Sequence, residues 1–271
     1  ALRLEGFHLP KLSAGELLCA SSSGAMPQLR SLLINYAGPA LTPAAARALA
    51  ASGWRLEELY LYGTSGLGAA GFAAILAAPT FALRRLTLGG CGLNGAALLA
   101  LTNAPWPLEG INLSANDFSA ATTAPALSAL TRHAGLRRLN VSNCRLSAAA
   151  FKALVEAAWP ALTYLGAIRA AVEFDGPRAL GAAAFAGFPA LEALHLSHVE
   201  LGEVGARLLA SRRWVRLRRL NVKRCGLGAA GLAALARGVW PALTWLSLGN
   251  NGLGAPLALE DARRWAPALE E

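Results

Sequence analysis

One short hydrophobic pattern recurs along the whole chain and constrains the fold more than any other feature. The pattern L-x-x-L-x-L, or a close variant, starts at ten leucines spaced by 25 to 29 residues. These leucines are Leu4, Leu29, Leu56, Leu83, Leu108, Leu136, Leu162, Leu191, Leu217 and Leu243. An eleventh repeat begins at Leu269. Ten segments in phase predict a stack of similar units, because a periodic sequence folds into a periodic structure.

Each repeat combines a strand pattern with a helix pattern. Counting its first leucine as position 1, apolar residues at positions 4 and 6 alternate with mostly polar ones at 3, 5 and 7, which predicts a strand. Position 9 is often Cys or Asn, and position 11 is usually apolar. An Ala/Leu-rich segment of about ten residues follows with helical spacing, as at Leu232, Leu235 and Val239. An aromatic residue, often beside a Pro that stops the helix, precedes the next repeat.

This pattern, L-x-x-L-x-L-x-x-N/C-x-L, resembles the leucine-rich-repeat family over residues 4–271. A repeat of about 26 residues with a helix is similar to its ribonuclease-inhibitor-like branch, which includes activators of the Ran GTPase. The resemblance implies an α/β fold, a right-handed solenoid of about ten repeats shaped like a horseshoe. A parallel β-sheet would line the concave face and helices the convex face. We expect one solenoid domain over residues 1–271, and its uncapped ends suggest that it is part of a longer protein or is covered by a partner.

One local motif points elsewhere when it is taken alone. The stretch GLGAAG, at Gly66–Gly71 and Gly226–Gly231, follows a strand pattern and opens a helix, as in a dinucleotide-binding turn. It recurs in nearly the same phase of the repeat, however, and no acidic residue follows about 20 residues later, where such a fold needs one. Gly71 and Gly231 are therefore expected to allow close helix packing, and we predict no cofactor.

The sequence contains no set of residues that predicts catalysis. The motifs G-x-S-x-G, H-E-x-x-H and the P-loop are absent, and the acidic residues form no convincing pair. His195 and His198 have no evident third partner for a metal. Cys91, Cys144 and Cys225 are in repeats that are not adjacent, so we expect buried free thiols that donate to the backbone. The chain is predicted to be no enzyme and to bind no metal.

Composition narrows the environment of the protein. Hydrophobic residues make up 55% of the chain, but no apolar run is long enough for a transmembrane helix, so we expect no membrane insertion. Free thiols favour a reducing, intracellular location, either the cytoplasm or the interior of an organelle. The net charge is +9, and 22 of the 25 basic residues are Arg. Arg suits recognition of carboxylates and phosphates, so an acidic partner surface is compatible with this charge.

Position 2 of successive repeats alternates in charge almost throughout. It holds Glu5, Arg30, Glu57, Arg84, Glu109, Arg137, Thr163, Glu192, Arg218, Thr244 and Glu270. Because adjacent parallel strands place these residues about 5 Å apart, the pattern predicts a ladder of ion pairs along the sheet.

The candidate partner-binding residues lie at positions 3, 5 and 7 of the predicted concave face. Tyr, Trp and Arg dominate binding hot spots, and Arg85, Arg138 and Arg219 have little neighbouring acid at their own position. Trp245 is the single Trp outside the helix-end position. The complete set is Tyr60, Tyr62, Arg85, Arg138, Asn140, Tyr164, His195, Arg219, Asn221, Lys223 and Trp245.

These observations favour a binding protein. The leading interpretation is a protein–protein interaction scaffold or adaptor within a larger assembly, which holds its partner in the concave groove. A second interpretation is a basic subunit that contacts RNA in a ribonucleoprotein. A third, a GTPase regulator of the Ran-activator type, comes from the family resemblance alone.

Overall fold

The computed structural model describes residues 2–4, 28–35, 41–173, 180–253 and 259–270. The chain divides into two compact halves, Ala1–Leu136 and Arg137–Glu271, which are described in turn. Leu4 contributes only its backbone to the description, and Glu5 of the predicted ladder lies outside the described residues.

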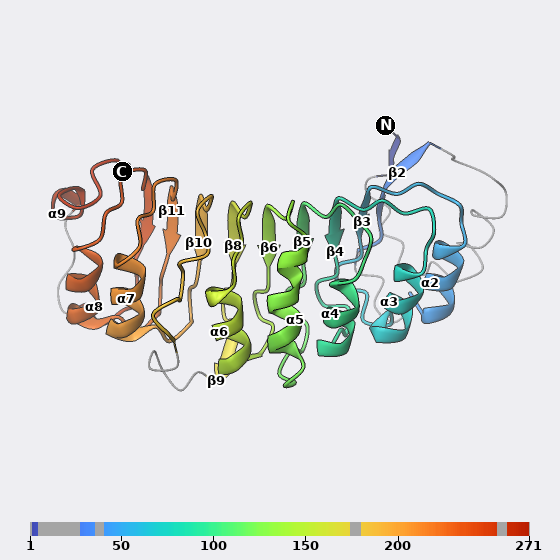
Figure 1. The fold of residues 1–271 in the computed structure, drawn as a ribbon, viewed down its shortest axis with the longest axis horizontal. Helices are drawn as coiled ribbons and strands as arrows, with labels where there is room; N and C mark the ends of the chain where they lie inside the picture. The colour runs from blue at the N-terminus through green and yellow to red at the C-terminus, as the bar shows by residue number, and fades with distance from the viewer. Residues whose placement is uncertain (1, 5–27, 36–40, 174–179, 254–258, 271) are drawn as a thin grey trace. The chain divides into compact units, whose positions relative to one another are not determined.

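The N-terminal half contains five parallel strands in chain order, and described helices separate β2, β3, β4 and β5 (Figure 1). Its elements are β1 (Leu2–Leu4), β2 (Leu29–Leu33), α2 (Pro43–Ala50), β3 (Glu58–Tyr60), α3 (Gly68–Leu76), β4 (Arg85–Thr87), α4 (Gly95–Leu101), β5 (Gly110–Asn112), α5 (Thr123–Ala129) and the 3-10 helix η2 (Leu130–Arg132). In β2 to β5 the position-4 residues Leu32, Leu59, Leu86 and Ile111 are in register. Adjacent strands in this half therefore align as the repeat predicts.

The C-terminal half repeats this arrangement. Its elements are β6 (Arg138–Asn140), β7 (Leu146–Ser147), α6 (Ala148–Glu156), β8 (Tyr164–Gly166), β9 (Ala171–Glu173), β10 (Ala193–His195), α7 (Gly202–Ala210), β11 (Arg219–Asn221), α8 (Gly228–Leu235), β12 (Trp245–Ser247) and α9 (Leu259–Arg263). Strands β6, β8, β10, β11 and β12 pair in that order, all parallel, and β7 pairs with β9 in a small second sheet. Leu139, Leu165, Leu194, Leu220 and Leu246 share one register.

The core of each half lies between the strands and the helices. The repeat leucines at positions 1, 4 and 6 are almost all buried, and so is the apolar residue at position 11, which includes Leu227 at 2% exposure. The aromatic residue before each strand closes this core. Trp159, Trp214 and Trp240 are buried, and each indole N–H donates to the carbonyl five residues earlier, at 2.9 to 3.0 Å. Each of these rings is therefore packed in the apolar core while its single hydrogen-bond donor, the indole N–H, has a partner.

The helices are shorter than the sequence predicts. Helix α8 ends at Leu235, and Val239, which was expected on its buried face, is 58% exposed. The helix cannot reach Val239 because the chain must turn back to place Trp240 at the next strand. In the long repeat that begins at Leu162, residues 182–187 form turns, and the Arg212 side chain donates to two of their carbonyls, those of Ala182 and Ala184.

Position 9 connects successive repeats through polar side chains. Asn116 accepts from the backbone N–H groups of Cys91 and Leu93 and donates to the carbonyls of Leu88 and Leu113. Asn251 bonds in the same way to the repeat that contains Cys225. One buried amide thus satisfies backbone groups of two repeats, which explains why Asn is used where the chain bends.

Position 8 has a left-handed backbone in eight repeats. Positive φ values of 49° to 71° occur at Gly63, Gly90, Ala115, Asn143, Arg169, His198, Arg224 and Asn250. Gly and Asn adopt this conformation readily, whereas other residues are disfavoured by roughly 1 kcal/mol.

The GLGAAG stretch of the C-terminal half follows from the same local geometry. Gly226 and Gly228 have φ values of 64° and 61°, and a Cβ on Gly231 would lie 2.9 Å from the Cβ of Leu227. Every glycine of the motif therefore has a conformational or packing reason, as the phase of the repeat predicts.

Candidate functional site

The outward faces of the strands carry the predicted binding residues, and the two halves differ in charge. We define the open face of each half as the side chains at positions 3, 5 and 7, which point away from the leucine core.

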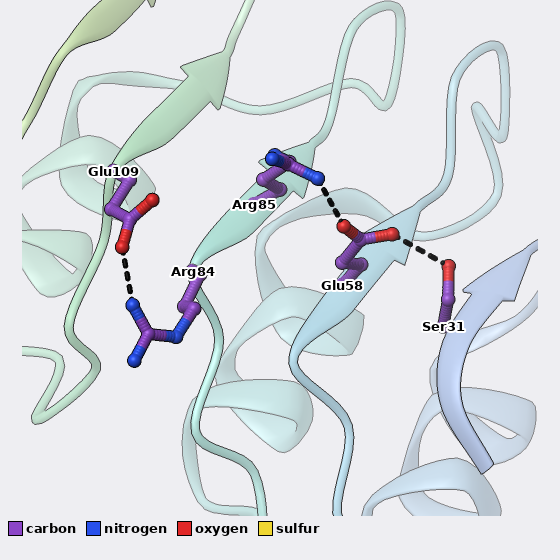
Figure 2. A network of polar contacts seen from close by, with 5 residues as sticks. All are labelled: Ser31, Glu58, Arg84, Arg85 and Glu109. Atoms are coloured by element: carbon purple, nitrogen blue, oxygen red, sulfur yellow. Dashed lines mark hydrogen bonds and ion pairs between the residues drawn. The ribbon is translucent and has the colours of Figure 1, made fainter. Parts of the chain in front are cut away.

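On the open face of the N-terminal half, the charges are compensated (Figure 2). Glu58 on β3 accepts from the Ser31 hydroxyl at 2.9 Å and forms an ion pair with Arg85 on β4. Burial alone would raise the pKa of Glu58, but the bonds from Ser31 and Arg85 outweigh it and hold this pKa below its ordinary value. Burial and the Glu58 charge raise the pKa of the neighbouring Tyr60 hydroxyl.

This network corrects one expectation. Arg85 was predicted to have little neighbouring acid, but it pairs with Glu58, because in-register parallel strands place the two residues directly side by side. Tyr62 is half-buried and covers Gly89, where a Cβ would lie 2.6 Å from its ring. Tyr60, Tyr62 and Arg85 are therefore already engaged by their own neighbours.

The predicted ladder at position 2 forms in pairs rather than as a continuous row. Arg30 lies 3.7 Å from Glu57, and Arg84 pairs with Glu109 (Figure 2). Among the described side chains, no ion pair joins Glu57 to Arg84 or Glu192 to Arg218. Among the described side chains at position 2, the sequence of alternating charges therefore yields two ion pairs, Arg30 with Glu57 and Arg84 with Glu109. Exposed pairs of this kind contribute little to stability.

The open face of the C-terminal half carries a row of rings that begins with a cation. The guanidinium of Arg138 on β6 lies 4.6 Å from the centre of the Tyr164 ring on β8. The Tyr164 ring is 5.4 Å from His195 on β10, and His195 is 6.2 Å from Trp245 on β12. We call these four residues the aromatic row. Trp245 is 44% exposed at its end.

Glycine makes room for the row. A Cβ on Gly166 would lie 3.0 Å from the Tyr164 hydroxyl oxygen and 2.9 Å from Oδ1 of Asn140. Asn140 and Asn221 have local duties as well, since their Oδ1 atoms accept from the backbone N–H of Ser142 and Lys223 at 3.0 and 3.1 Å. Through these bonds the two side chains stabilise the ends of their strands, and their role in partner binding stays a prediction.

The cations of this open face have no acidic partner among the side chains that the structure describes. Arg138, Arg219 and Lys223 are exposed, and no described carboxylate lies within ion-pair distance of any of them. His195 is half-buried, and its pKa is lowered by burial and by the Arg219 charge. The face therefore combines positive charge with exposed aromatic surface and a neutral imidazole at pH 7.

The cysteines take no part in this face. Cys91, Cys144 and Cys225 are free and buried, as predicted, and their thiols donate to backbone carbonyls, for example Cys225 to Leu196 at 3.2 Å. Burial raises the pKa of Cys225 to about 12. In the described part of the chain, no group of three or more His, Cys, Asp or Glu side chains is placed to hold a metal ion. None of the described helices has the length and apolarity needed to cross a bilayer.

Comparison with known proteins gives matches in structure only. No protein-family model matches the chain, and no curated protein matches it. The C-terminal domain of tropomodulin from Caenorhabditis elegans matches at 13% identity over 61% of this chain and 86% of that chain, with a TM-score of 0.36. The yeast Rad7 and Elc1 complex matches at 16% over 95% and 82%, with a TM-score of 0.38. An internalin from Listeria monocytogenes matches at 14% over 89% and 83%, with a TM-score of 0.35.

At such scores the fold assignment must come from the chain itself. It follows from the parallel strands in register, the leucines buried at fixed positions and the Asn and Cys side chains at position 9. The chain has the architecture of the leucine-rich-repeat proteins, an α/β solenoid.

Proposed function

We propose that this protein is a non-catalytic interaction scaffold that holds a protein partner on the open face of its C-terminal half. The observation that carries the proposal is the aromatic row, in which Arg138, Tyr164, His195 and Trp245 lie side by side on a face without described acids. Rings held by their neighbours lose little conformational entropy on binding, and Tyr, Trp and Arg supply most interface hot spots.

The position of Trp245 supports this function further. The other described Trp residues at the helix ends are buried or half-buried in the core, whereas Trp245 projects from a strand and remains 44% exposed. Its neighbours Arg219 and Lys223 add positive charge, which fits an acidic partner surface.

The proposal is tested by affinity capture with the purified chain and three variants. Trp245→Ala and Arg219→Glu alter the open face, whereas Val239→Ala truncates an even more exposed apolar side chain that lies outside the strands. We expect the first two to lose the captured proteins and the third to retain them. If all three recover the same proteins in the same amounts, the open face is not the binding surface.

RNA binding is the second candidate, because stacked rings and uncompensated cations also suit a single strand of nucleic acid. Salt separates the two functions. RNA affinity falls steeply as salt rises, in proportion to the phosphates neutralised, whereas ring contacts that become buried in a protein–protein interface respond weakly to salt.

The ribonuclease-inhibitor-like branch fits the helices of seven to nine residues in most repeats. A Ran-type effect on GTPases adds a third assay, in which an unchanged rate of GTP hydrolysis would exclude that role.

A further inference from the structure

A second charged feature lies at the turns that follow three strands of the C-terminal half. At position 8, where other described repeats hold Gly, Asn or Ala, the repeats of β8, β10 and β11 hold Arg169, His198 and Arg224. Their φ values are 49°, 63° and 54°, in the left-handed region that disfavours such side chains. Backbone conformations of this kind often mark functional positions.

Backbone hydrogen bonds hold the three residues in a column. The N–H of Arg169 donates to the Ser197 carbonyl at 2.9 Å, and the N–H of His198 donates to the Lys223 carbonyl at 2.9 Å. Adjacent strands are about 4.8 Å apart, so the side chains leave the sheet edge as close neighbours. Lys223, directly before Arg224, brings a fourth basic group. We call Arg169, His198, Lys223 and Arg224 the turn cluster.

The charges of the turn cluster have no acidic counterpart in the described part of the chain. Within the described residues, no carboxylate lies within ion-pair distance of Arg169, Lys223 or Arg224. The pKa of His198 is lowered, first by its partial burial and then by the charges of Arg169, Arg224 and Lys223. Glu200 is the nearby acid, but its carboxylate lies beside Gly226, where it occupies the space of a missing side chain. The cluster thus has three permanent positive charges around a neutral imidazole at pH 7.

We propose that the turn cluster is a binding site for a phosphate monoester, presented by a phosphorylated side chain of the protein partner. A phosphate monoester carries nearly two negative charges and three strong acceptor oxygens on one atom, which matches several cations that converge on one place. A single guanidinium group can donate two parallel hydrogen bonds to two oxygens of one phosphate. Phosphate binding as such is independent of the proposed function, whereas its delivery by a partner rests on it.

Inorganic phosphate is the first probe, because it requires no partner. We expect its addition to shift the NMR signals of the His198 ring in a saturable way and to raise the pKa of His198, since the anion cancels the repulsion of the surrounding cations. The double variant Arg169→Asn/Arg224→Asn should weaken phosphate binding at least about tenfold. Asn adopts the left-handed backbone readily, so this variant should fold.

Two control variants isolate the cluster. Arg237→Asn removes an exposed cation beyond α8, and Trp245→Ala disrupts the aromatic row; both should bind phosphate as the parent does. If the His198 signals and pKa stay unchanged in phosphate, or if Arg237→Asn weakens binding as much as the double variant, the site does not exist. Loss of partner capture by Trp245→Ala with phosphate binding intact separates this proposal from the proposed function.

Short peptides then identify the source of the phosphate. A phosphoserine peptide should bind the parent protein at least about tenfold more tightly than its serine and glutamate counterparts, and should lose this advantage in the double variant. Equal binding of the glutamate peptide would overturn the proposal, because a general acidic site would then suffice. Tighter binding of a single-stranded RNA of similar length, lost in the same variant, would also overturn it in favour of a phosphodiester ligand.

Discussion

At the scale of single residues, the buried polar side chains of the turns contribute more to stability than the exposed ion pairs at position 2. Asn116 is 4% exposed and forms hydrogen bonds with four backbone groups of two successive repeats. The exposed ion pairs at position 2 work in solvent, where screening and side-chain entropy offset most of the attraction.

We therefore expect Asn116→Ala to lower the free energy of unfolding by about 3 kcal/mol, because buried donors and acceptors lose their bonds. Asn103→Ala is the matched control, since Asn103 is exposed and accepts one bond from Arg132; its cost should stay below about 0.5 kcal/mol. Urea unfolding of both variants measures the difference. Equal losses would mean that the position-9 amide does not connect the repeats.

The left-handed turn leads to a second prediction for single residues. Arg169→Asn replaces a disfavoured residue by one that adopts φ near 50° readily, and it removes repulsion from its basic neighbours. The free energy of unfolding should stay the same or rise by up to about 1 kcal/mol. Thermal unfolding measures it, and a clear loss of stability would show that the arginine contributes to the fold.

The sequence predicted the leucine positions and the buried cysteines because both follow from the period of the repeat. It did not reveal the left-handed backbone at position 8, although Gly63, Gly90, Asn143 and Asn250 at that position are a readable signal for it. The contact of His195 with Trp245 was also missed, because it spans two strand spacings and depends on how the rings lean. Strand register predicts which residues are neighbours, as for Arg85 and Glu58, whereas side-chain rotamers decide whether rings two strands apart come into contact.

At the scale of elements, a buried tryptophan at the end of several helices packs between the helix and the next strand, as Trp159, Trp214 and Trp240 do. Trp106 differs from the others, because its buried indole N–H has no partner. The Leu101 carbonyl, five residues earlier, instead lies 3.1 Å from Nε2 of His133 in the following repeat. The Leu101 carbonyl is thus contacted by the imidazole of the next repeat, whereas the equivalent carbonyls before Trp159, Trp214 and Trp240 accept from the indole of their own repeat.

This contrast predicts different costs for one substitution. Trp240→Phe removes a ring edge and the bond to the Leu235 carbonyl, whereas Trp106→Phe removes a similar volume and an unpaired donor. Trp240→Phe should therefore reduce the free energy of unfolding by about 1 kcal/mol more than Trp106→Phe. Denaturant midpoints compare them directly, and equal midpoints would show that the indole bond adds nothing.

At the scale of the whole molecule, partly buried histidines that lie near cations make stability depend on pH. The pKa values of His195 and His198 are both lowered, so the unfolded chain binds more protons than the folded one just below the ordinary His value of about 6.5. Stability is therefore complete above this value and declines as the pH falls through it. Around His195 the relevant groups are Arg219, Tyr164 and Trp245.

Thermal unfolding between pH 7.5 and 5.5 tests this linkage. The parent should lose stability as the pH falls, and His195→Gln should lose less, because its side chain does not titrate. His195→Gln with the same slope as the parent would place the pH dependence elsewhere.

The amide of Asn116 belongs to one coil of the chain but supports the coil before it, and this sharing has a mechanical consequence. When the repeat that contains Asn116 unfolds, the preceding repeat loses these hydrogen bonds, so it is expected to unfold next. A chain stretched from one end should peel coil by coil, with each step releasing about 26 residues, or roughly 90 Å of extended chain. Such a molecule would extend under tension in small steps of similar length and would not unfold in one cooperative event.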